Sequence, residues 1–323
     1  MKNVSEMKCS EFSELIKEEL IGTAPVWKKL LVISFPVPWL ANINESDQFY
    51  KLFNKKLKVD DINSKLQDYR IQFISPDKDY MEEGLSKVLL FIRTKEESTF
   101  SKYKKMEFDV PEGMLGEFLI GLTDKKENDF KDYMVKPTKI RDLFVCIHAS
   151  RDICCGITGA PIYKSLKEKF NDHNTSSTRV WRMSHLGGHK YAPNVLDMPR
   201  GRLWARFNSS NIDDIFDSNV DLKEVFNYYR GSIGLNSPYE QVFESYVLSD
   251  SQNMDYKIIS DIEMLNSELA KITMERIEDL DNKKTIFTGF VKLDGYTKSI
   301  DCVTGAEKGN TPKYKIDQFE KLA

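Results

Sequence analysis

The stretches VCIHASRDICCG (145–156) and MSHLGGHKYAPN (183–194) decide how this chain folds and what it can bind. The apolar runs and turn signals around them predict a strand at 141–147, a helix at 160–170 and a second strand at 178–184. Each quoted stretch begins where a predicted strand ends. Because α/β sheets place their functional loops at the carboxyl ends of strands, we expect both stretches to meet at one edge of a sheet.

These stretches hold three of the cysteines and three of the histidines, and among them are a C-x8-C pair, Cys146 and Cys155, and an H-x3-H pair, His185 and His189. The whole chain contains only 5 cysteines and 4 histidines, so their concentration here indicates metal or redox chemistry. Structural zinc sites take their first two cysteines from shorter C-x2-4-C knuckles, so the longer loop favours a bulkier group. Each of the two glycines in HLGGH would cost about 1 kcal/mol inside a helix. The histidines are therefore predicted in a loop whose glycines take positive φ and let both imidazoles converge on one metal.

These residues resemble the sucrase/ferredoxin-like family. The resemblance rests on the C-x8-C pair, on the phrase HLGGHKYAPN and on the later YRGSIGL (229–235). The amino-terminal stretch CSEFSELIKEELIGTAPVWKKLLVISFPVPW (9–39) also resembles the opening of that family. Together these segments place the resemblance over roughly residues 8 to 240.

The resemblance implies a thioredoxin-like ferredoxin module with a 2Fe-2S cluster bound by Cys146, Cys155, His185 and His189. Many bacterial members of the family carry a cysteine two residues before the first histidine, and this chain has Met183 there. The presence of His189 instead matches the fungal members, whose cluster is held by two cysteines and two histidines. Zinc bound by the same four side chains is the alternative.

Mixed ligation has a predictable effect on such a cluster. Two ferric ions and two sulfides sum to about +2, so two thiolates and two neutral imidazoles leave a core near zero charge, whereas four thiolates leave about −2. An electron is more easily added to the neutral core, so we expect a raised reduction potential. An imidazole ligand also keeps one ring nitrogen that can hold a proton, so electron uptake should couple to proton uptake.

Some neighbouring residues offer other interpretations. Cys154 is a possible ligand in place of Cys155, although the resemblance favours the cysteine immediately before glycine. His148 is a possible alternative ligand or a donor to cluster sulfur, and its more ordinary interpretation is a histidine that satisfies loop backbone. Structural roles are predicted for four further residues: packing for Cys9 and Cys302, and a local ion pair that orders the cysteine loop for Arg151 and Asp152.

Composition agrees with a cytoplasmic redox protein. With 47 lysines and arginines against 50 acidic residues, the net charge is −3, so no basic field points to nucleic acid. No apolar run approaches the length of a membrane span, and the polar amino terminus does not resemble a signal peptide. The odd number of cysteines argues against a disulfide scaffold. The expected partner is a redox protein or reductase, and oligomeric state does not follow from the sequence.

Alternating apolar runs predict an α/β protein with three parts. These are an N-terminal α/β domain (1–138), a thioredoxin-like ferredoxin domain (139–236), and an extension with a helix and a β meander (237–323). The two α/β units could be diverged copies. Further expected elements are helices at 11–20, 45–57, 111–122, 220–229, 238–247 and 257–268, strands at 28–35, 69–75, 87–94, 98–108, 194–198 and 202–207, a hairpin turn at Asp294–Gly295, and a charged, at most partly ordered tail from 305.

Three functional classes follow from these residues. The leading one is an electron carrier with a 2Fe-2S cluster rather than a stand-alone enzyme. The second is a structural or binding module that holds zinc. The third is a thiol oxidoreductase using Cys154 or Cys155, but the chain lacks a C-x-x-C pair. Paired carboxylates suited to glycoside hydrolysis are not evident, so the word sucrase in the family name has no support in the sequence.

Overall fold

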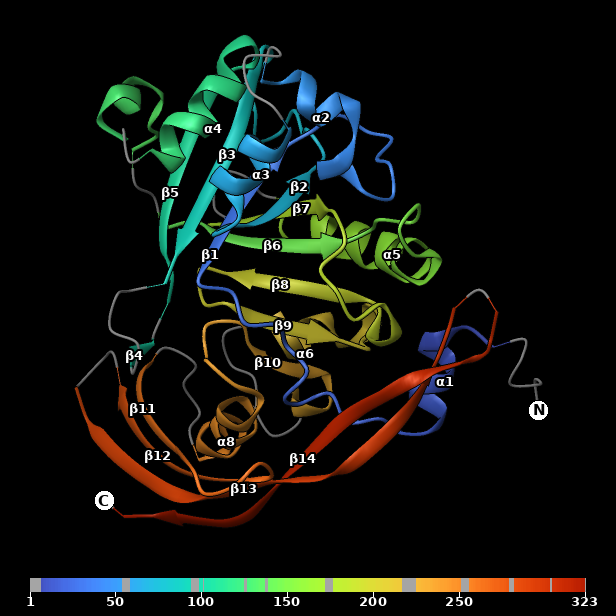
Figure 1. Ribbon diagram of the computed structural model, residues 1–323, viewed down its shortest axis with the longest axis vertical. Coiled ribbons are helices and arrows are strands. Elements are labelled where there is room, and N and C mark those ends of the chain that lie inside the picture. The colour runs from blue at the N-terminus through green and yellow to red at the C-terminus, as the bar shows by residue number, and fades with distance from the viewer. Residues whose placement is uncertain are drawn as a thin grey trace.

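The computed structural model describes residues 7–53, 59–93, 99–100, 102–124, 127–136, 139–171, 177–216, 225–250, 256–278, 282–302 and 304–322 of the chain. These residues form a nine-stranded mixed sheet and a separate five-stranded antiparallel sheet, with helices packed on both (Figure 1). The prediction of an α/β protein with a C-terminal helix and meander is confirmed.

The N-terminal half supplies four strands of the large sheet. β1 runs parallel to β2 and antiparallel to β3, which in turn pairs antiparallel with β5. Along β1, Leu31 and Ile33 pack under the helices while Leu30 and Val32 enter the opposite core, as the two-residue period of a strand requires. The elements are α1 (Cys9–Leu15), β1 (Lys29–Ser34), α2 (Asp47–Lys51), α3 (Val59–Leu66), β2 (Arg70–Ile74), β3 (Leu85–Ile92), β5 (Lys104–Pro111) and α4 (Leu115–Thr123).

The second half supplies the other five strands. α5 connects the parallel strands β6 and β7, and β8, β9 and β10 continue the sheet as antiparallel neighbours beyond β6. This succession confirms the thioredoxin-like order expected from the sequence. The elements are β6 (Arg141–Cys146), α5 (Ile153–Lys169), β7 (Thr178–Met183), β8 (Asn194–Met198), β9 (Arg202–Ala205), α6 (Ile212–Phe216) and β10 (Tyr229–Ser232).

The two halves repeat one strand arrangement. The sheet order is β10-β9-β8-β6-β7-β2-β1-β3-β5. Read outward from the centre, β2-β1-β3-β5 matches β7-β6-β8-β9, with a parallel inner pair and then antiparallel neighbours in each. β2 and β7 meet through one antiparallel pair, Ile74 and Met183, at the carboxyl ends of both strands. The edge that the sequence predicts for the site therefore lies at the junction of the two halves.

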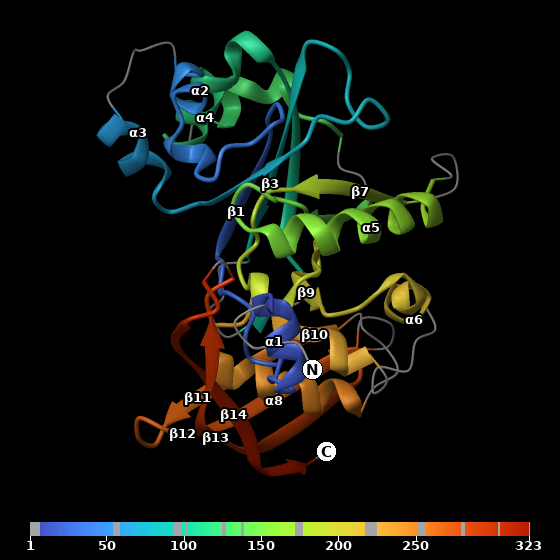
Figure 2. The same ribbon diagram turned by 90° about the vertical axis from the view of Figure 1, so that its right-hand side faces the viewer.

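The C-terminal part wraps a second sheet around a helix, as Figures 1 and 2 show. The strand order of this sheet is β14-β13-β12-β11-β4. Phe243 of α8 packs against Phe319 of β14, with ring centres 5.3 Å apart. The far end of the β13–β14 ribbon reaches α1 at the other end of the chain (Figure 1). The elements are β4 (Thr99–Phe100), α8 (Pro238–Ser249), β11 (Tyr256–Met264), β12 (Leu269–Glu278), β13 (Lys284–Ile300) and β14 (Glu307–Lys321).

Several local predictions in this C-terminal part are wrong. The helix expected at 257–268 is the strand β11, because its alternate side chains are buried against α8 and the next strand. The hairpin expected at Asp294–Gly295 is an irregularity inside β13, where Gly295 has φ 85° and the register with β14 shifts. The charged tail is an ordered strand, β14, because its backbone pairs along β13.

Other differences concern helix ends and cysteines. Helix 220–229 lies partly outside the described residues, and its described end is a short 3-10 turn followed by β10 from Tyr229. The helix expected at 45–57 is described only as α2, because 54–58 fall outside the described ranges. The strand expected near 98–108 is divided between β4 and β5, which belong to different sheets. Cys9 and Cys302, expected to be packing residues, are joined in a disulfide.

A buried ion network joins the two halves away from the junction. Arg179 of β7 donates two hydrogen bonds to Glu107 of β5, at 2.8 and 2.9 Å, and a third to Asp142 of β6 at 2.8 Å. Lys87 of β3 lies 2.8 Å from Glu107. Burial alone would disfavour ionisation of Glu107, but Arg179 and Lys87 outweigh it and hold its pKa well below the usual range. The network thus locks β5 of the first half to β7 of the second.

Glu107→Gln should lower the free energy of unfolding by about 3 kcal/mol at neutral pH, because it leaves Arg179 buried with one fewer carboxylate. The wild-type contribution of Glu107 is complete above the pKa of an unfolded glutamate and is lost as the pH falls through the lower folded-state pKa. Urea unfolding between neutral pH and about pH 3 should therefore show the difference between the two proteins shrinking. Glu112→Gln, an exposed change after the same strand, is the control. Equal stability of wild type and Glu107→Gln at neutral pH would contradict the assignment.

Candidate metal centre

Three of the four predicted ligands come together at the junction. The sulfur atoms of Cys146 and Cys155 and a ring nitrogen of His185 all lie within 4.8 Å of one another. The Cys155 sulfur is 3.5 Å from Nδ1 of His185. Both cysteines are buried, while the histidine is partly exposed. Two buried thiols and an imidazole in this arrangement are a donor set that can hold a metal ion.

The strands bring these residues together as the sequence predicts. β6 and β7 are parallel and pair Cys146 with Met183, so His185 follows two residues beyond the end of the same strand pair. The second cysteine differs from the prediction, because Cys155 lies in the first turn of α5 rather than in a loop. The helix starts early because Asp152 accepts a hydrogen bond from the backbone N–H of Cys154, 2.9 Å away, and so caps it.

A glycine allows α5 to approach the end of β6. A Cβ atom on Gly159 would lie 2.1 Å from the carbonyl oxygen of Cys146, which no side chain can tolerate. The helix can therefore lie directly against the backbone that carries the first cysteine, and Cys155 reaches the same buried region from the side. Gly159 could not be identified from the sequence, because it lies beyond the C-x8-C pair and its position gives no signal until the helix is placed.

The two thiols behave as a pair. A hydrogen bond from Cys155 holds the pKa of Cys146 well below its usual range, with a further contribution from His185 and against the cost of burial. The same hydrogen bond, together with burial, raises the pKa of Cys155. The pair therefore favours one thiolate and one thiol. Metal binding would displace the remaining proton, since only thiolate coordinates.

His189 is oriented differently from the other three predicted ligands. Its Nδ1 lies 2.8 Å from a carboxylate oxygen of Asp152, and its ring centre lies 6.0 Å from that of His185. Burial opposes ionisation of Asp152, but the hydrogen bond and charge of His189 outweigh it and hold the pKa of Asp152 below its usual value. A carboxylate on one ring nitrogen fixes the tautomer that leaves the other nitrogen free to bind a metal. His189 as the fourth ligand, through Nε2, stays a prediction.

His148 has a structural role instead of a place among the ligands. Its Nε2 lies 2.9 Å from the carbonyl oxygen of Leu40, and its Nδ1 accepts a hydrogen bond from the backbone N–H of His185 at 3.3 Å. Burial lowers the pKa of His148, which keeps the ring neutral, as this donor and acceptor pattern requires. The expected Arg151–Asp152 ion pair is not the arrangement found, because Arg151 hydrogen-bonds Asn42 while Asp152 caps α5.

The HLGGH segment is a loop, as predicted. Gly187 and Gly188 have φ of 88° and 70°, in the region that glycine adopts most readily. Arg230, a buried residue with no recognisable signal in the sequence, lies beneath the loop. Its Nη1 donates to the carbonyl oxygen of Gly187 at 3.0 Å and to Oδ1 of Asn194 at 2.8 Å, and its Nη2 donates to the carbonyl oxygen of Thr23 at 2.6 Å. The loop is thus fixed from below by one guanidinium.

Arg230→Lys should loosen this loop although it keeps the charge, because an ammonium cannot reproduce the planar fork of donors. The lost hydrogen bonds should lower the free energy of unfolding by about 2 kcal/mol, measured by urea denaturation. Metal bound per chain should fall in parallel, measured by elemental analysis. Arg182→Lys, an exposed change on β7, is the matched control and should alter neither quantity. Full metal content and unchanged stability in Arg230→Lys would contradict the role given to Arg230.

An open cavity of about 370 Å³ lies beside the site. Its lining includes His185, His148, Arg151 and Arg70, together with Gln72 of β2. The amide of Gln72 donates to the carbonyl oxygen of His185 at 3.1 Å, so the N-terminal half fixes this wall of the cavity. Both histidines are partly exposed and His185 is the one that lines this cavity, whereas both cysteines are enclosed.

Among the described residues, no helix is both long and apolar enough to cross a membrane.

Comparisons with known proteins identify a family and several relatives. The sucrase/ferredoxin-like family model matches residues 20–231, which include all four predicted ligands. "Altered inheritance of mitochondria protein 32" of Meyerozyma guilliermondii is 27% identical over 112 residues, which cover 32% of this chain and 37% of that protein. The protein of the same name from Candida glabrata is 33% identical over 104 residues, covering 29% of this chain and 33% of that protein.

A third relative is "Actin patches distal protein 1" of Saccharomyces cerevisiae, 31% identical over 74 residues, covering 19% of this chain and 23% of that protein. The matched segments thus span well under half the length of these curated relatives. No solved structure matches the chain. The family model, in contrast, covers most of the chain and both ligand pairs, so the chain belongs to the sucrase/ferredoxin-like family.

Proposed function

We propose that this chain is an electron-transfer protein that binds a 2Fe-2S cluster through Cys146, Cys155, His185 and His189. The observation that carries the proposal is the convergence of the first three within 4.8 Å at the junction of the two halves. The donor types fit such a cluster, because two thiolates and two imidazoles are the ligands of mixed-ligation 2Fe-2S centres. When bound, the cluster accepts and returns one electron at a potential above that of all-cysteine clusters.

The residues around the site support the same function. Burial of Cys146 and Cys155 excludes water from the thiolates, which protects them from oxidation and strengthens their charge interactions. Asp152 holds the ring of His189 in one orientation, and Arg230 places a buried positive charge beneath the loop that carries both histidines. That positive charge offsets part of the negative charge of the thiolates.

Electrons and protons reach the site from its solvent-exposed side. His185 lines the open cavity, so its ring is the route by which an external donor or acceptor approaches most closely. Arg151 and Arg70 line the same cavity and outnumber its one carboxylate, Glu45, so the lining carries net positive charge. A redox protein or reductase with an acidic docking surface would fit this opening. A cytoplasmic location is part of the proposal and is tested by cell fractionation.

The deciding experiment is the analysis of iron, zinc and acid-labile sulfide in anaerobically purified protein, with its absorption spectrum. We expect two irons and two sulfides per chain and a coloured protein that is bleached on reduction. A colourless protein with stoichiometric zinc would refute the electron-transfer proposal and support the zinc-binding module. Iron-free, zinc-free protein that exchanges disulfides through Cys154 or Cys155 would support the thiol oxidoreductase instead.

A further inference from the structure

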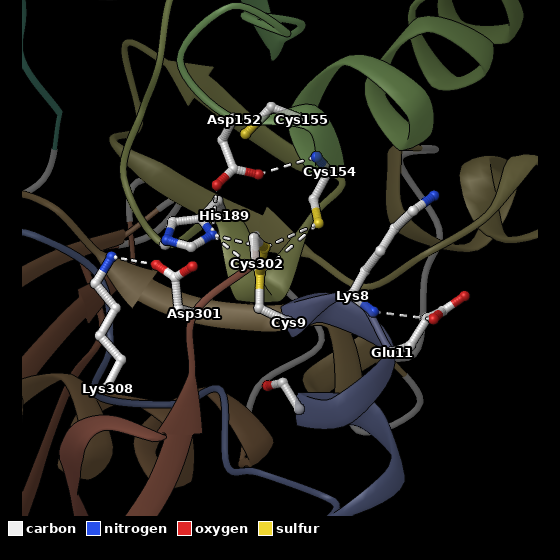
Figure 3. The surroundings of a disulfide bond; sticks show 12 residues. Lys8, Cys9, Glu11, Asp152, Cys154, Cys155, His189, Asp301, Cys302 and Lys308 are labelled. Carbon is white, nitrogen blue, oxygen red and sulfur yellow. Dashed lines mark hydrogen bonds and ion pairs between the residues drawn. A yellow bond between two sulfur atoms is a disulfide. The ribbon is translucent and has the colours of Figure 1, made fainter. Parts of the chain in front are cut away.

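A second group of sulfur atoms lies on the other side of His189 (Figure 3). Cys9 comes from α1, Cys154 from the first turn of α5, and Cys302 from just beyond β13, so segments from both ends of the chain meet a helix from its middle. The Cys154 sulfur is 3.7 Å from that of Cys9 and 3.3 Å from that of Cys302. Cys9 and Cys154 are buried, and Asp152 completes a group of four donors within 4.8 Å.

The disulfide between Cys9 and Cys302 does not make Cys154 an exchange nucleophile in this arrangement. Attack on a disulfide runs along the S–S axis, so the attacking sulfur lies about 2 Å farther from the leaving sulfur than from its target. Cys154 differs by only 0.4 Å in its distances to the two sulfurs, 3.7 and 3.3 Å. It therefore lies beside the bond, and the three sulfurs form a triangle.

A triangle of sulfurs with a carboxylate above it has the shape of one coordination sphere. In a tetrahedral zinc site with Zn–S bonds near 2.3 Å, the sulfurs lie about 3.8 Å apart. Two of the three sulfur pairs here, at 3.7 and 3.3 Å, already approach that value. The third pair is the disulfide, which must open before its sulfurs can separate.

We propose that reduction of the Cys9–Cys302 disulfide creates a second metal site, in which Cys9, Cys154, Cys302 and Asp152 bind Zn²⁺. This site shares no ligand with the proposed cluster and does not rest on it. An intracellular dithiol supplies two electrons and two protons, becomes a disulfide itself and leaves two thiols on Cys9 and Cys302. Zinc then displaces the protons of three thiols and takes the Asp152 carboxylate as its fourth donor.

Bound zinc would hold the two ends of the chain to the helix that carries Cys155. α1 and the β13–β14 ribbon otherwise contact α5 through a small apolar cluster, which includes Ala192 and Ile300 around the cysteines. Nδ1 of His189 lies 2.8 Å from Asp152 and 3.0 and 3.4 Å from the sulfurs of Cys9 and Cys302, so the new site touches one predicted cluster ligand through its carboxylate and two of its sulfurs. Under oxidising conditions the disulfide links α1 to the end of β13, and under reducing conditions the metal would link the same two segments.

The test uses the full chain with Cys146→Ser and Cys155→Ser, so that zinc cannot occupy the proposed cluster site. This protein is reduced with a phosphine under anaerobic conditions, mixed with Zn²⁺, freed of excess metal and analysed for zinc per chain. One zinc per chain is expected, and a further Cys302→Ser or Cys9→Ser change should reduce it at least tenfold. Far-UV circular dichroism confirms that each variant is folded.

Two further measurements make the outcome decisive. Co²⁺ in place of Zn²⁺ should give the thiolate charge-transfer absorption of a sulfur-rich tetrahedral site. A disulfide oxidant should release the metal and restore the Cys9–Cys302 linked peptide in mass spectrometry. Reduced, folded protein that binds no zinc, or zinc that persists after Cys302→Ser, would overturn the proposal. Loss of zinc binding here would leave the cluster untouched, since that is measured as iron and sulfide in the wild-type chain.

Discussion

Cys155→Ala is expected to abolish stable iron binding, whereas Cys154→Ala, one residue earlier, is expected to retain it. The two side chains leave the same helical turn in different directions. Cys155 lies within 4.8 Å of Cys146 and His185, and Cys154 instead faces Cys9 and Cys302. The loss of one thiolate removes one of the four proposed ligands. His148 does not replace it, because both of its ring nitrogens already contact backbone groups. Cys146→Ala should have the same effect as Cys155→Ala.

Iron and sulfide per chain, measured on anaerobically purified variants, check this prediction. Because a bound cluster stabilises only the folded state, Cys155→Ala should also melt at a lower temperature than Cys154→Ala. Cys154→Ala is the matched control, as it removes an equally buried thiol from the same turn. A normal cluster in Cys155→Ala together with its loss in Cys154→Ala would reverse the ligand assignment.

The location of the site was predictable because few residues could form it. Cysteine and histidine are rare in this chain, and apolar runs identify β6 and β7 clearly, so the ends of two strands implied the meeting of Cys146 and His185. The start of α5 was not predictable from propensity. Gly156, Gly159 and Pro161 all disfavour a helix, yet the capping side chain and close packing on β6 outweigh them.

In the C-terminal part, by contrast, the local sequence does not predict the secondary structure. Polar and apolar residues in β11 fit a helix or a strand about equally well, and the choice is made by pairing with β12, the next strand, and with β4, which lies far away in sequence. β14 is rich in charged residues and holds its place through backbone hydrogen bonds to β13 rather than through a continuous apolar face. Neither kind of tertiary pairing leaves a local pattern.

The strand arrangement shared by the two halves also leaves no pattern that can be recognised in the sequence. β2-β1-β3-β5 and β7-β6-β8-β9 match in order and direction, although the residues along them show no visible identity. Such an arrangement needs only alternating apolar strands and a crossover helix, which many sequences satisfy. Only the second half carries the cysteine and histidine pairs, so the first half serves the site by closing the cavity wall with Gln72.

The histidines should give the protein a reduction potential that depends on pH. We expect the midpoint potential to fall as the pH rises, with a slope approaching 59 mV per pH unit for a one-electron, one-proton couple. Reduction adds negative charge next to the imidazoles and so favours a proton on the ring nitrogen that does not bind metal. His185 lines the solvent cavity, whereas Nδ1 of His189 is held by Asp152. Proton exchange is therefore expected mainly at His185.

Two variants separate the roles of the histidines. Replacing either neutral imidazole by a thiolate should lower the potential by an amount on the order of 100 mV or more. His185→Cys should in addition flatten the pH dependence, because it removes the ring that exchanges protons with solvent, whereas His189→Cys should keep most of the slope. Redox titration across about pH 6 to 10 measures both effects. A potential that is flat with pH in the wild type and unchanged in both variants would eliminate histidine ligation. The cluster would then need other ligands. Cys154 would be the first to examine, because it lies in the same helical turn as Cys155.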